Sequence, residues 1–450
     1  MGRHDEYLNY SYSRKRRGRR SGGPFIGILV VVLLALAAGF TTYHLTSGSL
    51  GDRWSQGQFA GFLDGEHIEP TQVAVVTEAP VTAAPIPTKA PTLTPTPVTT
   101  PHIYQKDYLV DYVDNREKVQ VRGIYAADLT LRSSKLDYYI NLCKTTELNA
   151  IVINVKNDDG TISYMMDCES AEKAGTLTDN QGDVKALVEK LHENGIYCIA
   201  RIVCFRDEKI QETNPGWLLS RKDGSRYKDT QGIMWVNPYN ESACKYIVDV
   251  ACQAAADGFD EICFDYIRTA TSYVSTIDFG AKAVEDHTLT EQIVEFTKYA
   301  CNRLKPMGVF VSASVYGIVI NSSVDAEAIG QDYTELAKYL DYICPMIYPS
   351  HYAETYAGIA RPDAAPYELV DHELQSSNKK LAAVQQVSGQ QLAECRPWLQ
   401  SFTASWLDHY IKYTTPVIRK QIDACYDNGI QAWMYWNAAG NYDEDAFKKN

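Results

Sequence analysis

DGFDEICFDYIR, residues 257–268, combines a helix end, a short buried strand and a carboxylate in twelve positions. Gly258 follows a helical run and suits the left-handed turn that ends a helix. Residues 259–264 are short and mostly apolar, which is typical of a parallel strand covered on both faces. Asp265, Tyr266 and Arg268 follow at the carboxyl end of this strand. In a closed barrel, that end carries the functional groups.

The same order of helix, glycine and strand recurs along the chain. It precedes YCIARIVCF (197–205), FVSASVYG (310–317) and QAWMYWN (431–437). Four more strands are predicted at 121–129, 149–157, 341–349 and 396–406, with helical periodicity between the strands. Eight alternating units within residues 102–450 predict a (β/α)8 TIM barrel of the α/β class. An open doubly wound sheet is the alternative, but no glycine-rich nucleotide loop follows the first strand.

The N-terminal region indicates a membrane anchor. Residues 1–23 contain seven Lys/Arg and two Asp/Glu and are expected to form a basic cytoplasmic tail. Residues 24–45 are uncharged and apolar over about 20 positions, enough for one transmembrane helix. We therefore expect contact with the lipid bilayer, a single pass through the cell membrane, and an extracellular barrel. A cleaved signal peptide is the alternative, although the apolar run exceeds the usual length of about 7 to 15 residues.

Residues 46–101 are predicted to be an extracellular low-complexity linker, because Pro and Thr dominate much of the segment. The basic N-terminal tail differs in charge from the rest of the chain, which is acidic. Of the 43 basic and 56 acidic residues, 36 and 54 lie after residue 23. This acidic balance argues against nucleic acid or a polyanionic substrate as the main partner, since phosphate binding needs concentrated basic charge, and it is compatible with neutral or cationic polymers.

Eleven cysteines occur without a C-x-x-C pair or a Cys/His spacing that suits zinc. We predict no metal site and no cofactor. Cys198, Cys263 and Cys344 fall inside predicted strands and are expected to be buried thiols.

A barrel brings the ends of its strands together, and the chain places carboxylates after the first four strands and aromatic or amide groups after the last four. Asp265 is expected to act as nucleophile or base, with Asp128 or Asp158 as proton donor; helix capping is the alternative role for the latter two. Asp260 and Glu261, at the other end of the strand, are expected to be solvated or capping groups. Arg268 is expected to orient Asp265. The predicted substrate-binding residues are Tyr266, Arg268, Tyr316, Tyr348, His351, Gln400, Trp436 and Asn437.

Five short motifs suggest a family. They are VRGIY (121–125), FDYIR (264–268), PMIYPSHY (345–352), RPWLQ (396–400) and WMYWN (433–437). Through them, residues 121–436 resemble the putative glycoside hydrolase domain family of bacterial proteins. The resemblance implies a TIM-like barrel related to glycosidases. The D-x-x-D-x-D-x-E run of chitinase-like barrels is absent, which argues against their substrate-assisted mechanism.

These observations together predict a membrane-anchored extracellular glycoside hydrolase that acts on a cell-wall or capsular polysaccharide. The alternative is a barrel that binds glycan without cleaving it, as a surface scaffold or receptor. The two hypotheses differ in geometry. A second carboxyl group within about 10 Å of Asp265 would favour hydrolysis, and its absence would favour binding alone.

Overall fold

The computed structural model describes residues 113–127 and 129–448. Eight parallel strands form a closed ring in the order β1-β2-β3-β5-β7-β8-β10-β11, which closes where β11 pairs with β1. They are β1 (Arg122–Ala126), β2 (Ala150–Lys156), β3 (Tyr197–Val203), β5 (Glu261–Asp265), β7 (Phe310–Tyr316), β8 (Tyr342–Ile347), β10 (Trp398–Gln400) and β11 (Trp433–Trp436). A further short strand, β9 (Glu394–Cys395), pairs with the start of β8. The predicted (β/α)8 barrel is confirmed.

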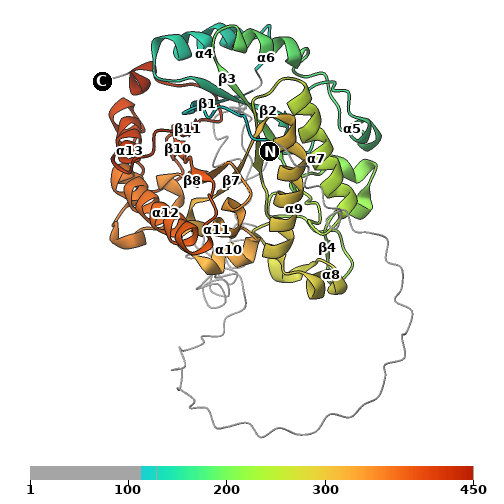
Figure 1. Cartoon of the computed structure of the whole chain (residues 1–450). Coiled ribbons are helices and arrows are strands. Elements are labelled where there is room, and N and C mark those ends of the chain that lie inside the picture. The colour runs from blue at the N-terminus through green and yellow to red at the C-terminus, as the bar shows by residue number, and fades with distance from the viewer. Residues whose placement is uncertain (1–112, 128, 449–450) are drawn as a thin grey trace, which may run out of the picture.

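Helices surround the strands (Figure 1). The main ones are α4 (Ser134–Thr145), α6 (Val184–His192), α7 (Glu241–Ala256), α9 (Leu289–Leu304), α11 (Tyr333–Ala337), α12 (Pro366–Ser388) and α13 (Thr415–Asp427). Additional helices are α5 (Glu169–Ala174), α8 (Ala281–Asp286) and α10 (Ser323–Ile329). Helix α12 extends to Ser388, because no glycine or proline occurs between its first residue and Gly389.

Local sequence signals explain where the helices begin and end. Helix α9 starts at a capping box, in which Thr288 and Glu291 satisfy each other's backbone N–H groups. Helix α7 starts at Asn240, whose side chain accepts a hydrogen bond from the backbone N–H of Ala243. After α7, Gly258 adopts a φ of 110°, which a residue with a side chain would rarely adopt. The turn predicted at this glycine is confirmed.

Alternate residues of each strand point into the barrel, where they form layers. Near the amino ends of the strands, Glu261 of β5 forms a fully buried ion pair with Arg396. Ser312 donates a hydrogen bond to Glu261, and the Arg396 guanidinium lies 4.2 Å from the ring centroid of Tyr342. The expectation that Glu261 is solvated or a cap is therefore wrong, because it belongs to the inward-facing set of β5. We call Glu261 and Arg396 the basal pair.

The segments after β3 and β5 are long and contact each other. Residues of β4 (Ser220–Arg221) and β6 (Ile277–Asp278) form a two-stranded antiparallel sheet. Tyr227 donates a hydrogen bond to the backbone carbonyl of Ser272 at 2.5 Å. These contacts build a wall beside the carboxyl ends of β3 and β5. We call the carboxyl ends of all eight barrel strands, taken together, the rim.

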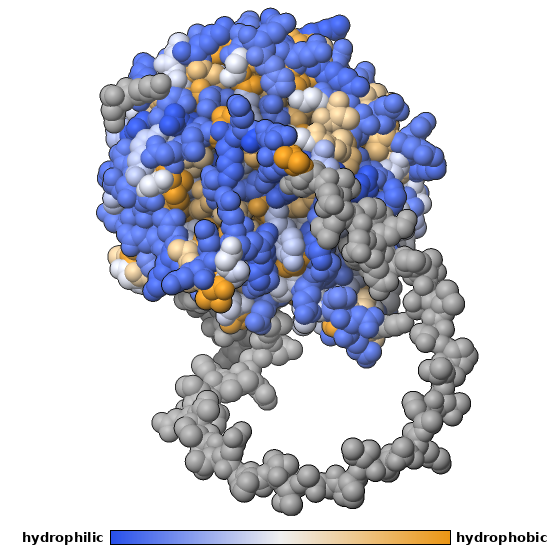
Figure 2. Space-filling model, viewed as in Figure 1, coloured by the Kyte–Doolittle hydropathy of each residue, from blue (hydrophilic) through white to orange (hydrophobic). Residues whose placement is uncertain are grey.

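The visible face of the molecule is mostly hydrophilic, with small dispersed hydrophobic spots (Figure 2). Cys198, Cys263 and Cys344 are fully buried, as predicted. The predicted cytoplasmic tail (1–23), transmembrane helix (24–45) and linker (46–101) lie outside the described residues. Within residues 113–127 and 129–448, no helix combines the length and apolarity needed to cross a membrane.

Candidate active site

One arginine joins two carboxylates at the rim. Nη2 of Arg201, on β3, lies 2.8 Å from Oδ1 of Asp158 and 2.7 Å from Oδ2 of Asp265. Because both oxygens contact the same nitrogen, their separation cannot exceed the two contact distances laid end to end. A second carboxyl group therefore lies well within the roughly 10 Å that separates the two hypotheses. We call Asp158, Arg201 and Asp265 the bridged cluster.

Strand order explains why these groups meet. Asp158 follows β2, Arg201 lies on β3 and Asp265 ends β5, and these three strands are neighbours in the barrel. Asn154 of β2 accepts a hydrogen bond from Nη1 of Arg201 at 3.0 Å and donates one to the hydroxyl of Tyr125 at 2.7 Å. The guanidinium is thus fixed from two strands.

Charge and burial differ within the bridged cluster. The Arg201 side chain is 3% exposed, the Asp265 side chain 11% and the Asp158 side chain 29%. Burial alone would lower the pKa of Arg201, but the charges of Asp158 and Asp265 hold that pKa well above its usual value. Arg201 therefore stays a cation and balances one of the two carboxylates.

Asp265 is held by Arg201, and the expectation that Arg268 orients it is wrong. Nε of Arg201 donates to Oδ2 of Asp265 at 2.7 Å, and the backbone N–H of Tyr266 donates to Oδ1 at 2.8 Å. Arg268 instead donates to the carbonyl of Thr269 and to the hydroxyl of Tyr316. The physical reason is direction: Asp265 points into the barrel, whereas Tyr266 turns the chain with a φ of 50° before Arg268.

The backbone of Tyr266 is itself a signal of function. A positive φ is uncommon for a bulky residue and costs about 1 to 3 kcal/mol, and such strain concentrates at functional sites. The Tyr266 ring lies beside three arginines, with its centroid 5.9 Å from Arg201, 5.5 Å from Arg206 and 5.0 Å from Arg268. The strained turn thus places an aromatic ring against the cations of the rim.

Tyr348 and His351 lie on the opposite part of the rim, after β8. Burial, and then the charge of Asp265, raise the pKa of the Tyr348 hydroxyl well above its usual value, so this group remains a proton-bearing donor. His351 packs edge-on against the rings of Tyr348, Phe402 and Trp406. Burial lowers the pKa of His351 to about 4, so its imidazole is neutral at neutral pH.

Trp436, at the end of β11, stacks on Tyr125 with ring centroids 4.1 Å apart. The Arg201 guanidinium carbon lies 5.3 Å from the Trp436 ring. The indole N–H is fully buried and has no hydrogen-bond acceptor among the residues that the structure describes. Trp436 therefore forms an aromatic side of the bridged cluster, where the sequence predicted a sugar-binding group.

Two of the predicted substrate-binding amides serve the fold. Gln400 is fully buried; its Oε1 accepts from the backbone N–H of Ser350 and its Nε2 donates to the carbonyl of Phe402. Asn437 donates to the carbonyls of Ser401 and Asn441. These hydrogen bonds occupy the side-chain amides of Gln400 and Asn437. Each amide bonds to the loop that follows the strand that it lies on or directly follows. We assign them a supporting role in place of the predicted contact with substrate.

Asp128 lies outside the described residues, so its predicted role stays a prediction. The sequence reasoning missed Arg201, Asn154 and Tyr125. A signal for the first two was present: Arg201 is the one charged side chain of β3, and Asn154 is a polar side chain inside the apolar run of β2. A buried polar group needs a partner, so both residues could have been assigned to the polar end of the barrel interior.

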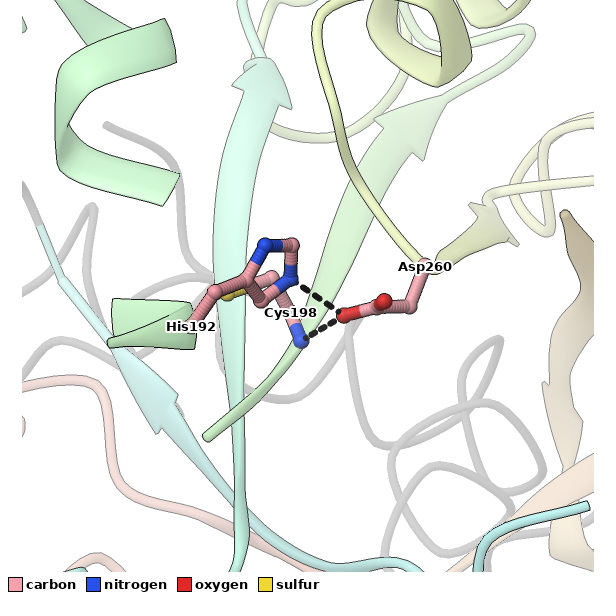
Figure 3. Close-up of side chains that lie close together, drawn as sticks. All are labelled: His192, Cys198 and Asp260. Carbon is pink, nitrogen blue, oxygen red and sulfur yellow. Dashed lines mark hydrogen bonds and ion pairs between the residues drawn. The ribbon is translucent and has the colours of Figure 1, made fainter. Parts of the chain in front are cut away.

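A different cluster lies near the amino ends of the strands, away from the rim. His192, Cys198 and Asp260 offer ligand atoms within 4.8 Å of one another (Figure 3). However, Oδ2 of Asp260 already contacts Nε2 of His192 at 2.9 Å and accepts from the backbone N–H of Cys198 at 2.7 Å. The burial of Cys198 also raises the pKa of its thiol, which disfavours the thiolate that zinc binds. The arrangement is explained as a clamp between α6, β3 and the start of β5.

A closed (β/α)8 barrel, with two carboxylates on one arginine nitrogen and aromatic rings at its rim, has the features of the glycoside hydrolase class. Comparison with known proteins agrees. Residues 123–442 match the family described as "Putative glycosyl hydrolase domain", and the chain belongs to this family.

Solved structures that resemble the chain are numerous. A hypothetical protein from Ruminiclostridium thermocellum is 30% identical over 42% of this chain and 96% of its own, with a TM-score of 0.39. The glycoside hydrolase domain of PgaB (BpsB) from Bordetella bronchiseptica is 14% identical over 74% of this chain and 99% of its own, with a TM-score of 0.51. The latter likeness shows the fold alone. No curated protein matches the chain.

Proposed function

We propose that this protein is a membrane-anchored, extracellular glycoside hydrolase that cleaves a cell-wall or capsular polysaccharide. The observation that carries the proposal is the bridged cluster, in which one arginine nitrogen contacts two carboxylate oxygens at 2.8 and 2.7 Å. A pair held in this way matches the roughly 5 to 5.5 Å of retaining glycosidases and is closer than the roughly 6.5 to 9.5 Å of inverting ones.

Charge balance suggests how the two carboxyl groups divide the work. Two carboxylates share one arginine, and a retaining mechanism needs one of them as proton donor and the other as nucleophile. Asp265 accepts hydrogen bonds from both Arg201 and the backbone, which suit an ionised nucleophile. Asp158 is the more exposed of the two and has room to meet a leaving group. We therefore assign Asp158 as the proton donor, with Asp128 as the other predicted candidate.

The reaction then proceeds in two steps. A carboxylate oxygen of Asp265 attacks the anomeric carbon while Asp158 gives its proton to the departing glycosidic oxygen, which leaves as an alcohol. The sugar is then held as an ester of Asp265. In the second step a water molecule gives a proton to Asp158 and attacks the anomeric carbon, which releases Asp265 as a carboxylate.

The membrane anchor is part of this proposal, because only the sequence supports it. The basic tail and apolar run at residues 1–45 favour an outward-facing barrel. The linker of residues 46–101 would separate the barrel from the bilayer.

The test is release of reducing sugar ends by the full chain in detergent micelles, incubated with purified cell-wall and capsular glycans. Wild type is expected to release ends, and Asp265→Asn is expected to lose about 10⁴-fold in rate while it stays folded. Asp260→Asn is the matched control, because Asp260 precedes the same strand at its opposite end. Glycan retention by wild type and both variants without any release would favour the glycan-binding barrel instead.

A further inference from the structure

Arg268 sits in an unusual environment at the rim, three residues after Asp265. It is 4% exposed, and its guanidinium lies among three aromatic rings. The guanidinium carbon is 4.9 Å from the Trp235 ring centroid, 5.0 Å from that of Tyr266 and 4.6 Å from that of Tyr316. These rings fix the plane of the guanidinium and shield it from water.

The hydrogen bonds of Arg268 leave donors unused. An arginine has five N–H donors, and Arg268 uses one for the carbonyl of Thr269 and one for the hydroxyl of Tyr316, at 2.8 and 2.7 Å. Its Nε makes no hydrogen bond to a described residue, yet it is absent from the fully buried unbonded atoms. Nε of Arg268 therefore faces space that solvent can reach.

Arg268 also lacks a counter-ion where its neighbours have one. Arg201 contacts Asp158 and Asp265, and Nε of Arg206 lies 4.0 Å from Asp229. In the part of the chain that the structure describes, no carboxylate lies within ion-pair distance of Arg268. A shielded cation without an anion is costly, which indicates that the anion arrives with the ligand.

We propose that Arg268 binds a carboxylate of the glycan, so that the substrate is an acidic polysaccharide in which uronic acids alternate with neutral sugars. A guanidinium fork matches a carboxylate in two hydrogen bonds, and the surrounding rings suit the C–H faces of a pyranose. The acidic charge of the chain after residue 23 disfavours a dense polyanion, which is why neutral sugars must separate the acids. This inference rests on the proposed function.

The experiment measures binding by the full chain in detergent micelles. The probes are hyaluronan, unsulfated chondroitin and heparosan, which each carry one glucuronate per disaccharide, and the same polymers with their carboxyl groups reduced to alcohols. Wild type is expected to bind at least one acidic polymer about tenfold or more tightly than its reduced form. This comparison needs no variant, so it does not depend on how a substitution folds.

Variants locate the effect. Arg268→Gln is expected to remove the preference for the acidic polymer, and Arg268→Lys to keep part of it. Arg303→Gln, a change on the outer helix α9, is expected to leave the preference unaltered. Equal binding of the acidic and reduced forms, no binding of any acidic polymer, or a preference that survives in Arg268→Gln would overturn the inference.

The two proposals fail in different ways. Release of reducing ends from neutral glycans, with no preference for acidic ones, would leave the proposed hydrolase intact and remove the role of Arg268. Selective binding of an acidic polymer, with no release of ends from any glycan, would keep the role of Arg268 and count against hydrolysis.

Discussion

Strand β5 carries two carboxylates on its inward face, and each meets an arginine from another part of the barrel. Glu261, near the amino end, pairs with Arg396, and both side chains are fully buried. Asp265, at the rim, pairs with Arg201, which a second carboxylate shares. One arginine balances one carboxylate at the base, whereas one arginine serves two at the rim. The same interaction can therefore hold a barrel together at the amino ends of its strands or bring two carboxylates close to each other at the rim.

After Asp265→Asn, the next largest predicted effect also concerns the rim. Asp158→Asn removes the proposed proton donor while it keeps the shape of the side chain, so the rate of glycan cleavage is expected to fall about 10³-fold. The free energy of unfolding should change little, because Asp158 is partly exposed. Reducing-end release and urea unfolding measured on the same preparation check both statements. Unchanged cleavage would return the donor role to Asp128.

The basal pair should show the opposite behaviour, with a large effect on stability and little effect on cleavage. Glu261→Gln leaves Arg396 buried without an anion and is expected to lower the free energy of unfolding by about 3 to 5 kcal/mol. Cleavage per folded molecule should stay near that of wild type. Glu394→Gln is the control, because its ion pair with Lys118 is exposed and contributes about 0 to 1 kcal/mol. A stable Glu261→Gln protein that has lost activity would contradict the division into a structural base and a reactive rim.

A third carboxylate shows what happens without an arginine. Glu373 of α12 is fully buried, and burial raises its pKa to about 7, against hydrogen bonds from Tyr356 and Asn321. His372, whose Nε2 is 3.9 Å from Oε1 of Glu373, and the charge of Lys380 are the basic influences on this carboxyl group.

This raised pKa predicts a pH dependence of stability. In the folded protein the Glu373 carboxyl group keeps its proton up to about pH 7, whereas in the unfolded chain the same group loses it near pH 4.5. Stability should therefore fall as pH rises through this window, by on the order of 3 kcal/mol. Thermal unfolding between pH 4 and 8 is the measurement, and Glu373→Gln should reduce the slope. The same slope in the variant would rule out Glu373 as its cause.

The smallest predicted effect sharpens the role of the shared arginine. Arg201→Met removes the cation that both carboxylates contact, so the pair should keep a proton to higher pH in the variant. The acid limb of the pH profile of kcat/KM is expected to move upward by about one pH unit or more. Arg221→Gln, in the wall beside the rim, is the control and should leave the profile in place. An unshifted profile in Arg201→Met would show that Arg201 does not govern the charge of the pair.

The fold was largely predictable because its strands are apolar runs between clear helix signals. All eight strands follow from this pattern, although the run predicted at 396–406 contributes only Trp398–Gln400 to the barrel. The pattern could not predict the length of α12. The C-terminal half of this helix is exposed, so it has no apolar stripe from which the end of the helix could be recognised.

The site was predictable only in part. The rule that strand ends meet at one rim correctly placed Asp158 and Asp265 together. It could not show that Arg201 joins them, because pairing between strands depends on register and not on sequence spacing. It also misassigned Gln400, since whether an amide faces solvent or closes a loop depends on the conformation of residues 401–413. Arg268 was placed at the rim but given the wrong partner.

The central claim is that Asp158 and Asp265 act as a closely spaced catalytic pair. The most direct test follows the anomeric proton of the first product by NMR as the full chain cleaves a glycan. A pair bridged by a single arginine nitrogen predicts a product that first appears with the anomeric configuration of the substrate. A product that first appears with the inverted configuration would require a wider pair and would contradict the account.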